Sequence, residues 1–226
     1  MKRRTLLKRS LAASLTSLAG AGAASGAAWR VAVFEADVTP PLGHACMGGG
    51  ITAVKSVTDP LHARGCVLLG EGPPIVIVSI EWCEIRNRSY DAWRGALAQA
   101  AGTVPARVLV SSTHVHNAPV MDEEAEALLK ASGSTGSVGD PAFNAEAISR
   151  TVKALSVAMQ QPIAVSHYGI GQAKVEGVAS NRRVVLPDGR VAYNRMSRCT
   201  DPVLRDAAEG DIDPWMKTLS FWAEDR

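Results

Sequence analysis

Aromatic side chains and long apolar runs are both scarce in this chain of 226 residues. Phe, Trp and Tyr together make up only 5% of the sequence. No run of about 18 strongly apolar residues occurs, which argues against a membrane-spanning helix. Collagen-like, coiled-coil and disordered classes do not fit either, because 46% of the residues are hydrophobic and only 20% are charged. The composition predicts one globular domain, or one part of a larger domain.

The sequence also lacks a large excess of charge of one sign. It has 24 basic and 22 acidic side chains, a formal net charge of +2. Five of the basic side chains lie within the first nine residues, which contain no acid. Without those five, 19 basic face 22 acidic side chains, and the net charge becomes −3. The chain therefore lacks the basic surface that a nucleic-acid-binding protein needs, and we expect no such partner.

Cysteine is sparse, and no C-x-x-C spacing occurs. This argues against a thiolate zinc site of that type and against a thioredoxin-like redox motif. The four cysteines could form disulfides in an oxidising compartment, with three connectivities. The apolar neighbours of Cys66 and Cys83 instead favour buried free thiols at these two positions. The remaining cysteines are Cys46 and Cys199.

The N-terminus has the layout of a removable signal peptide over residues 1–28. A basic start that contains Arg3 and Arg4 precedes a weakly apolar Ala/Leu/Gly/Ser stretch, and residues 21–23 offer an A-x-A cleavage site. The arginine pair and the low hydrophobicity resemble a twin-arginine signal. An ordinary secretory signal and a cytoplasmic protein with an Ala-rich leader are the alternatives. We expect a periplasmic or secreted protein whose mature domain spans residues 29–226.

The first half of the mature chain predicts a β-α-β unit. Residues 30–37 alternate as a half-buried strand does, and the apolar runs 64–69 and 75–80 predict a hairpin. A helix over 89–101, capped by Ser89 and stopped by Gly102, leads to another apolar strand at 107–112. Strands 75–80 and 107–112 would be parallel, because a helix connects them.

The second half predicts a helix and several strands. After a linker-like tract at 131–139, which we expect to be a mobile surface loop, Asp140 and Pro141 begin a helix that runs to about residue 160. Strands are expected at 163–170 and 216–222, with a hairpin at 184–193 that turns at Asp188-Gly189. The expected fold class is α/β: a mixed β-sheet with a β-α-β unit and flanking helices, as part of a larger layered domain.

Two histidines at the end of a strand are the strongest chemical signal. Residues 108–112 are followed by Thr113-His114-Val115-His116. In extended backbone this spacing places both imidazoles on the same side, at the carboxyl end of a parallel strand, where α/β sheets bind ligands. Imidazole is a common zinc ligand, and zinc serves many hydrolases. Two hydrogen-bonded surface histidines are the alternative.

Three segments, in this order, resemble the N-terminal part of the neutral/alkaline non-lysosomal ceramidase family. They are residues 34–43 (FEADVTPPLG), 58–64 (TDPLHAR) and 111–119 (SSTHVHNAP). They are similar to the family's A-D-I-T-P-P-x-G, D-P-L-x-A-R-A and T-H-T-H-S-x-P elements. The resemblance extends over roughly residues 33–222, and the T-H-x-H-x-x-P element is its most specific part. It implies a zinc-dependent amidase that cleaves the N-acyl bond of ceramide, a lipid amide.

The resemblance also implies metal ligands. His114 or His116 would bind zinc, with the other histidine nearby. In many members a further histidine ligand precedes the D-P-L-x-A-R element, but Thr58 occupies that position here. His62 or Asp59 could take its place, although His62 could equally be an ordinary side chain beside a strand.

Three further residues are candidates around the site. Asn181-Arg182 resembles an N-R element that places an arginine near the substrate, where it would bind a hydroxyl or an oxyanion; a solvated charge is the alternative for Arg182. Glu81 follows strand 75–80 and could orient an imidazole ligand. It could instead pair with an arginine such as Arg86 or Arg88.

The family's nucleophilic serine, and a glutamate and a tyrosine that also bind zinc, lie beyond the region that matches. We therefore expect an N-terminal portion that lacks the nucleophile and is inactive alone. A non-catalytic exported lipid- or carbohydrate-binding domain is an open alternative. So is a different metal-dependent hydrolase, such as an esterase, on the same scaffold.

Overall fold

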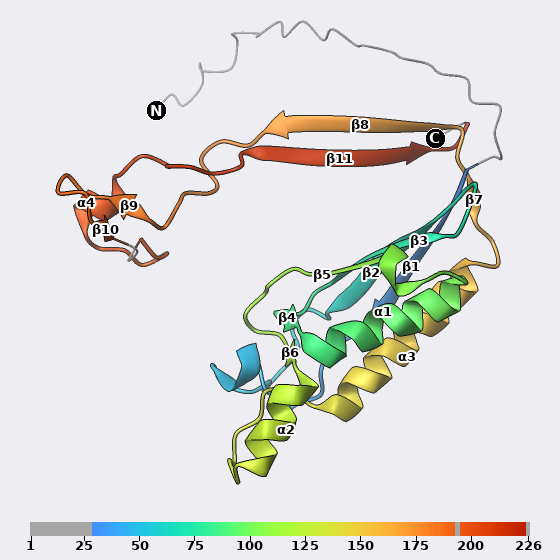
Figure 1. Cartoon of the computed structure of the whole chain (residues 1–226), viewed down its shortest axis with the longest axis horizontal. Helices are drawn as coiled ribbons and strands as arrows, with labels where there is room; N and C mark the ends of the chain where they lie inside the picture. Colours follow the sequence, from blue (N-terminus) through green and yellow to red (C-terminus); the bar gives the residue numbers. More distant parts are fainter. Residues whose placement is uncertain (1–28, 193–194, 225–226) are drawn as a thin grey trace, which may run out of the picture.

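A five-stranded mixed sheet forms the centre of the molecule. The structure, a computed structural model, describes residues 29–192 and 195–224 (Figure 1). The strand order is β5-β3-β2-β1-β7. β3 and β5 run parallel, and the other neighbours in the sheet run antiparallel. The strands are β1 (Arg30–Asp37), β2 (His62–Leu69), β3 (Ile75–Ile80), β5 (Val108–Ser112) and β7 (Ile163–Ala164).

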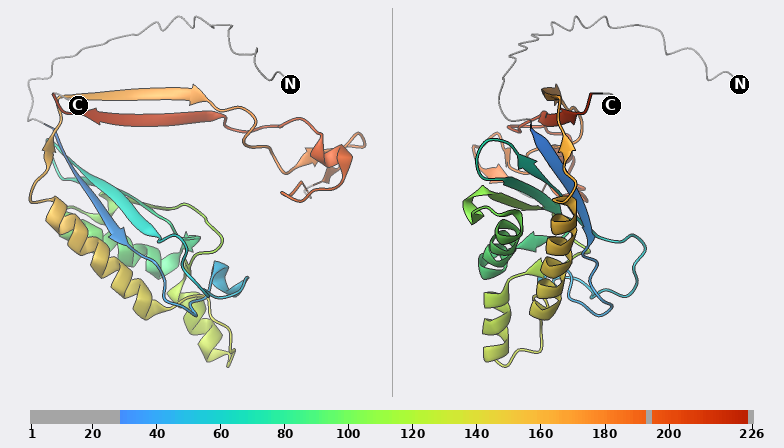
Figure 2. Two further views of the ribbon diagram at one scale, coloured as in Figure 1. Left: turned by 180° about the vertical axis from the view of Figure 1, so that it is seen from behind. Right: turned by 90° about the vertical axis from the view of Figure 1, so that its right-hand side faces the viewer.

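Two long helices cover one face of this sheet, side by side (Figures 1 and 2). α1 (Asn87–Ala101) connects β3 to β5 and buries Trp93 and Leu97. α3 (Pro141–Ala158) buries Phe143 and Leu155. The α/β fold class, the hairpin β2–β3 and the parallel β3-α1-β5 unit are thus confirmed. Helix 140–160 is confirmed too, and the Asp140 side chain accepts a hydrogen bond from the Ala142 N–H, as an N-cap should.

The core lies between the sheet and these helices. Val76, Val78 and Ile80 alternate along β3 and are fully buried on the helix side. The opposite face of the sheet is open: Val33 on β1 and Leu109 on β5 are each more than half exposed. Trp82, just after β3, is fully buried, and its indole N–H donates to the Val38 carbonyl at 2.9 Å.

A two-stranded ribbon extends away from the sheet (Figures 1 and 2). It pairs β8 (His167–Lys174) with β11 (Trp215–Trp222) in antiparallel register. The predicted continuous strand 163–170 is wrong, because the chain changes partner in the middle. The Val165 N–H bonds to the Trp29 carbonyl, whereas the Ser166 N–H bonds to the Trp222 carbonyl. The predicted strand 216–222 is confirmed within β11.

Small elements complete the described chain. The predicted hairpin at 184–193 is present as β9 and β10, with Gly189 at a φ of +80° in its turn; residue 193 lies outside the described residues. The remaining short elements are β4 (Glu84–Ile85), β6 (Val120–Met121), α2 (Glu123–Ala131), β9 (Val184–Val185), β10 (Val191–Ala192), α4 (Pro202–Arg205) and 3-10 turns at Met47–Gly49 and Pro105–Arg107.

Two local predictions need correction. Ser89 does not cap α1, because the helix begins two residues earlier, at Asn87; Ser89 is buried in the first turn and its Oγ accepts from the Glu123 N–H at 3.2 Å. The tract 131–139 is a loop only from residue 132, because α2 continues to Ala131. The end of that loop is held by hydrogen bonds to Glu126.

Within residues 29–192 and 195–224, no helix has both the length and the apolar character needed to cross a membrane. The predicted signal peptide, residues 1–28, lies outside the described residues.

Candidate metal centre

His114 and His116 lie on the loop that joins β5 to β6, beyond the carboxyl end of the parallel strands. The expectation that extended backbone brings their rings together is wrong, because β5 ends at Ser112 and His114 has a φ of +62°. Left-handed backbone is unfavourable for a residue with a Cβ. The two rings nevertheless meet edge to face, with centroids 5.0 Å apart.

Backbone hydrogen bonds fix this loop against the connection from β3 to α1. The His114 N–H donates to the Trp82 carbonyl at 3.1 Å, and the Cys83 N–H donates to the Pro119 carbonyl at 2.9 Å. Beside them, β4 and β6 pair in parallel. Two segments about thirty residues apart in sequence are therefore held in one register.

Three side chains from these two segments converge. Donor atoms of Cys83, Glu84 and His114 all lie within 4.8 Å of one another. The Nδ1 atom of His114 is 3.7 Å from the Cys83 Sγ and 3.6 Å from a Glu84 carboxylate oxygen. It also lies 3.1 Å from the Cys83 carbonyl oxygen. Sulfur, oxygen and imidazole nitrogen are all zinc donors, so these residues fit a zinc ion chemically.

The surroundings of Cys83 keep its thiol protonated in the absence of a cation. Burial raises the pKa of this thiol, and the neighbouring Glu84 carboxylate raises it further, against a smaller opposing effect of Arg86. Arg86 also forms an ion pair with Glu84. A bound divalent cation would reverse this balance, because it stabilises the thiolate directly. All four cysteines are unpaired, and Cys83 is buried as predicted, whereas Cys66 is only half-buried.

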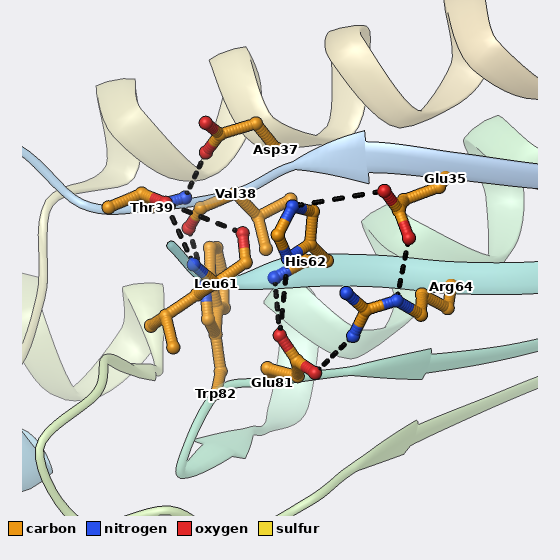
Figure 3. Close-up of polar contacts among 9 residues, drawn as sticks. All are labelled: Glu35, Asp37, Val38, Thr39, Leu61, His62, Arg64, Glu81 and Trp82. Atoms are coloured by element: carbon orange, nitrogen blue, oxygen red, sulfur yellow. Dashed lines mark hydrogen bonds and ion pairs between the residues drawn. The ribbon is translucent and has the colours of Figure 1, made fainter. Parts of the chain in front are cut away.

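A second polar cluster surrounds Glu81 and His62 on the open side of the sheet (Figure 3). The Glu81 carboxylate accepts from the His62 backbone N–H at 2.7 Å, lies 3.5 Å from the His62 Nδ1 and pairs with Arg64. Arg64 also bonds to Glu35 at 2.6 Å, and the other ring nitrogen of His62 is 3.8 Å from Glu35. Burial raises the pKa of Glu81, but these hydrogen bonds and charges lower it overall.

This second cluster is arranged for ion pairing, not for holding a cation. The two nitrogens of His62 face different carboxylates, those of Glu35 and Glu81. The Arg64 guanidinium already pairs with both of these carboxylates. Glu81 thus pairs with Arg64 instead of the predicted Arg86 or Arg88. The imidazole beside Glu81 is that of His62. Asp59 is exposed in the bend that precedes β2.

Asn181 and Arg182 lie on the segment between β8 and β9, beyond the ribbon and apart from the loop after β5 (Figures 1 and 2). Asn181 bonds to the carbonyls of Glu209 and Asp211, at 2.7 and 3.1 Å. Arg182 is exposed. The structure thus brings His114 and His116 together but does not place this pair beside them. Substrate binding by Asn181 and Arg182 stays a prediction.

Sequence reasoning assigned Cys83 to the core and gave Glu84 no role. One signal could have identified both. Cys83 and Glu84 follow the end of β3 directly, and β3 is the parallel neighbour of the strand that leads to His114. Residues that follow adjacent parallel strands meet at one edge of the sheet.

Comparisons with protein families and with curated proteins find no match for this sequence. Solved structures do match. A ceramidase complexed with C2 superposes with a TM-score of 0.59 at 17% identity, over 88% of this chain and 29% of that one. The neutral ceramidase from Pseudomonas aeruginosa gives 0.57 at 18% identity, over 88% and 30%. The fold is ceramidase-like. At this identity the likeness concerns the fold, and the chain spans about 30% of the length of the ceramidases it matches.

Proposed function

We propose that this chain is part of an exported, metal-dependent amidohydrolase that cleaves the N-acyl amide bond of ceramide-like lipids. The observation that carries the proposal is the ceramidase-like fold together with the paired imidazoles of His114 and His116 on the loop after β5. The twin-arginine-like N-terminus supports export to the periplasm or beyond.

The loop after β5 suits contact with a substrate. The His114 side chain is 59% exposed, so a bound molecule can reach its ring, whereas its backbone is fixed by the Trp82 carbonyl. A zinc ion, when bound, polarises a carbonyl or acidifies a water molecule. The chain's own residues would hold that ion, and the neighbouring imidazole would accept or return a proton.

The test measures amide hydrolysis and zinc content together. The protein, produced from its complete reading frame with the natural N-terminus, is recovered from the periplasmic fraction and incubated with an N-acylsphingosine in mixed micelles. We expect fatty acid and sphingosine in equal amounts, and bound zinc near one equivalent. Replacing the metal-binding histidine of the pair, His114→Ala or His116→Ala, should remove both the zinc and the turnover.

His167→Ala is the matched control, because His167 is an exposed histidine at the start of β8. It should change neither zinc content nor turnover. Faster turnover of an ester with the same acyl chain would point to an esterase on this scaffold. Lipid binding that a chelator leaves intact, with no hydrolysis, would replace the proposal by the non-catalytic binding domain, which Thr58 at the family's histidine position favours.

A further inference from the structure

We propose that one face of the β8–β11 ribbon binds the surface of a lipid bilayer that carries negatively charged headgroups. The proposal goes beyond the proposed function, because it concerns residues outside the candidate metal centre and holds whether or not the protein hydrolyses an amide. It follows from the way in which side chains alternate between the two faces of a ribbon that extends away from the core (Figures 1 and 2).

The register of the ribbon separates its side chains into two unlike faces. Opposite residues in an antiparallel pair share a face, and successive residues of a strand alternate between faces. One face, here named the docking face, carries the cross-strand pairs Tyr168–Phe221, Ile170–Leu219, Gln172–Lys217 and Lys174–Trp215. The other face carries mostly small or polar side chains, namely His167, Gly169, Gly171, Ala173, Met216, Thr218, Ser220 and Trp222.

The docking face begins as an apolar patch that is open to solvent. Tyr168 and Ile170 are 69% and 80% exposed, and Leu219 beside them is 50% exposed. Trp215, at the other end of the face, is 47% exposed. A contiguous apolar patch of this kind marks a contact surface, whereas single exposed apolar residues are ordinary. Tyrosine and tryptophan suit a membrane interface, because each ring combines an apolar body with a polar hydrogen-bonding group.

The charges on the ribbon favour an anionic partner. β8 and β11 contain two lysines, Lys174 and Lys217, and no acidic residue, and both lysines lie on the docking face. Their ion-pair partners, Glu176 and Asp213, lie outside the two strands, at 3.3 and 3.9 Å. All four side chains are more than half exposed, so these ion pairs are weak and lipid phosphates can replace the acids. An apolar patch beside basic side chains is the arrangement of proteins that lie on anionic membranes.

The size of the docking face favours a lipid surface over a second copy of the chain. Strands of eight residues are about 26 Å long, and two of them side by side are about 10 Å wide. One face therefore measures roughly 260 Å² in projection, whereas a stable interface between proteins buries roughly 800 Å² on each side. A lipid surface needs no such area, because a few inserted apolar side chains and two lysines are enough for reversible binding.

Vesicle co-sedimentation of the full chain tests the proposal. We expect the protein to bind vesicles of phosphatidylcholine and phosphatidylglycerol, with a blue shift of tryptophan emission, and to bind phosphatidylcholine alone more weakly. The double variant I170S/L219S should lose binding to both kinds of vesicle. K174Q/K217Q should weaken binding to the anionic vesicles by at least about tenfold, because each lysine near an anionic surface contributes roughly fivefold. Far-ultraviolet circular dichroism checks that each variant is folded.

L128S and K153Q are the matched controls, because Leu128 on α2 and Lys153 on α3 are exposed and lie outside the ribbon. Both variants should bind vesicles as the wild type does. Absence of vesicle binding by the folded wild type, or binding that the two ribbon variants leave unchanged, would overturn the inference. So would a dimer that I170S/L219S abolishes, seen by analytical ultracentrifugation without vesicle binding, because the face would then belong to a second copy. Vesicle binding without amide hydrolysis would overturn the proposed function and leave this inference intact, and hydrolysis without vesicle binding would do the reverse.

Discussion

Single carboxylates decide much of the local order in this molecule, and Glu126 is the clearest case. Its side chain is buried, and it accepts hydrogen bonds from the Val138 N–H at 2.7 Å and the Ser137 Oγ at 3.1 Å. Burial raises the pKa of Glu126, but these bonds, with Gly139 and Lys130, lower it overall. The ionised carboxylate therefore ties α2 to the loop that leads into α3.

Replacing Glu126 by Gln should destabilise the protein by about 1–2 kcal/mol at pH 7, because hydrogen bonds to a charged acceptor become bonds to a neutral one. The folded-state pKa is lowered, so the charge stabilises the fold above the unfolded-state value of about 4.3 and ceases to do so as the pH falls through the folded-state pKa. Thermal unfolding from pH 7 to pH 3 measures both effects. The difference in Tm between the two proteins should shrink below about pH 4.

Glu124→Gln is the control for this experiment. Glu124 lies on the same helix, but its side chain is exposed and pairs with Arg88 at 3.0 Å. Its loss should change stability by less than about 0.5 kcal/mol. An equal effect of both substitutions would show that the charge of α2, and not the bonds to the loop, is what matters.

At the scale of elements, the spacing of apolar residues predicts which face of a helix is buried, but it does not predict how neighbouring strands pack. The apolar face of α1 is readable from the sequence, because Trp93 and Leu97 lie one helical turn apart, and both are buried. The side-chain contacts between neighbouring strands could not be predicted from the sequence. Gly65 on β2 lies beneath the ring of Phe34, its partner on β1.

Gly65→Ala should destabilise the sheet by about 1–3 kcal/mol, because the new methyl group overpacks the space between strands. A Cβ at this position would lie 2.7 Å from the Ile77 carbonyl oxygen and would also press on the Phe34 ring. Urea unfolding measures the change in midpoint. A neutral result would mean that Phe34 moves aside without cost.

Gly95→Ala provides the opposite case within the same fold. Gly95 is inside α1, and a Cβ there meets nothing within 4 Å. Alanine has the higher helix propensity, so this variant should be more stable by up to about 1 kcal/mol. The pair separates crowding from any general effect of losing a glycine.

The whole molecule has two regions of unequal packing. The sheet and its helices share one core, whereas the ribbon β8–β11 extends alone and exposes Tyr168, Ile170 and Leu219 by half or more. A two-stranded ribbon without a packed face is marginally stable by itself. Local stability should therefore differ sharply along the chain.

Amide hydrogen exchange should show this difference. We expect peptides from β8 and β11 to exchange roughly a hundredfold or more faster than peptides from β2 and β3, because a few kcal/mol separate local opening from global unfolding. Mass spectrometry at two protein concentrations gives the measurement. Equal protection at low concentration would mean that the ribbon is packed in solution, and protection only at high concentration would show that a second copy covers it.

The sequence by itself determined the elements that depend on local spacing. The alternation in 30–37, the helix signals of Asp140 and Pro141, and the Asp188-Gly189 turn act over a few residues, so each was correctly predicted. The parallel pairing of β3 and β5 was also predictable, because parallel neighbours need a long crossover connection, usually a helix, and α1 supplies one. The histidine pair was visible because His114 and His116 are only two positions apart in the sequence.

Only the tertiary structure decided which side chains meet. Glu81 turned to Arg64 and not to Arg86, because the register of β2 against β3 places Arg64 beside it. Cys83 and Glu84 came to His114 through the pairing of two strands of two residues each, too short to leave a periodic signal. Contacts between distant segments depend on register and on backbone hydrogen bonds, and neither has a signature in the local pattern of residues.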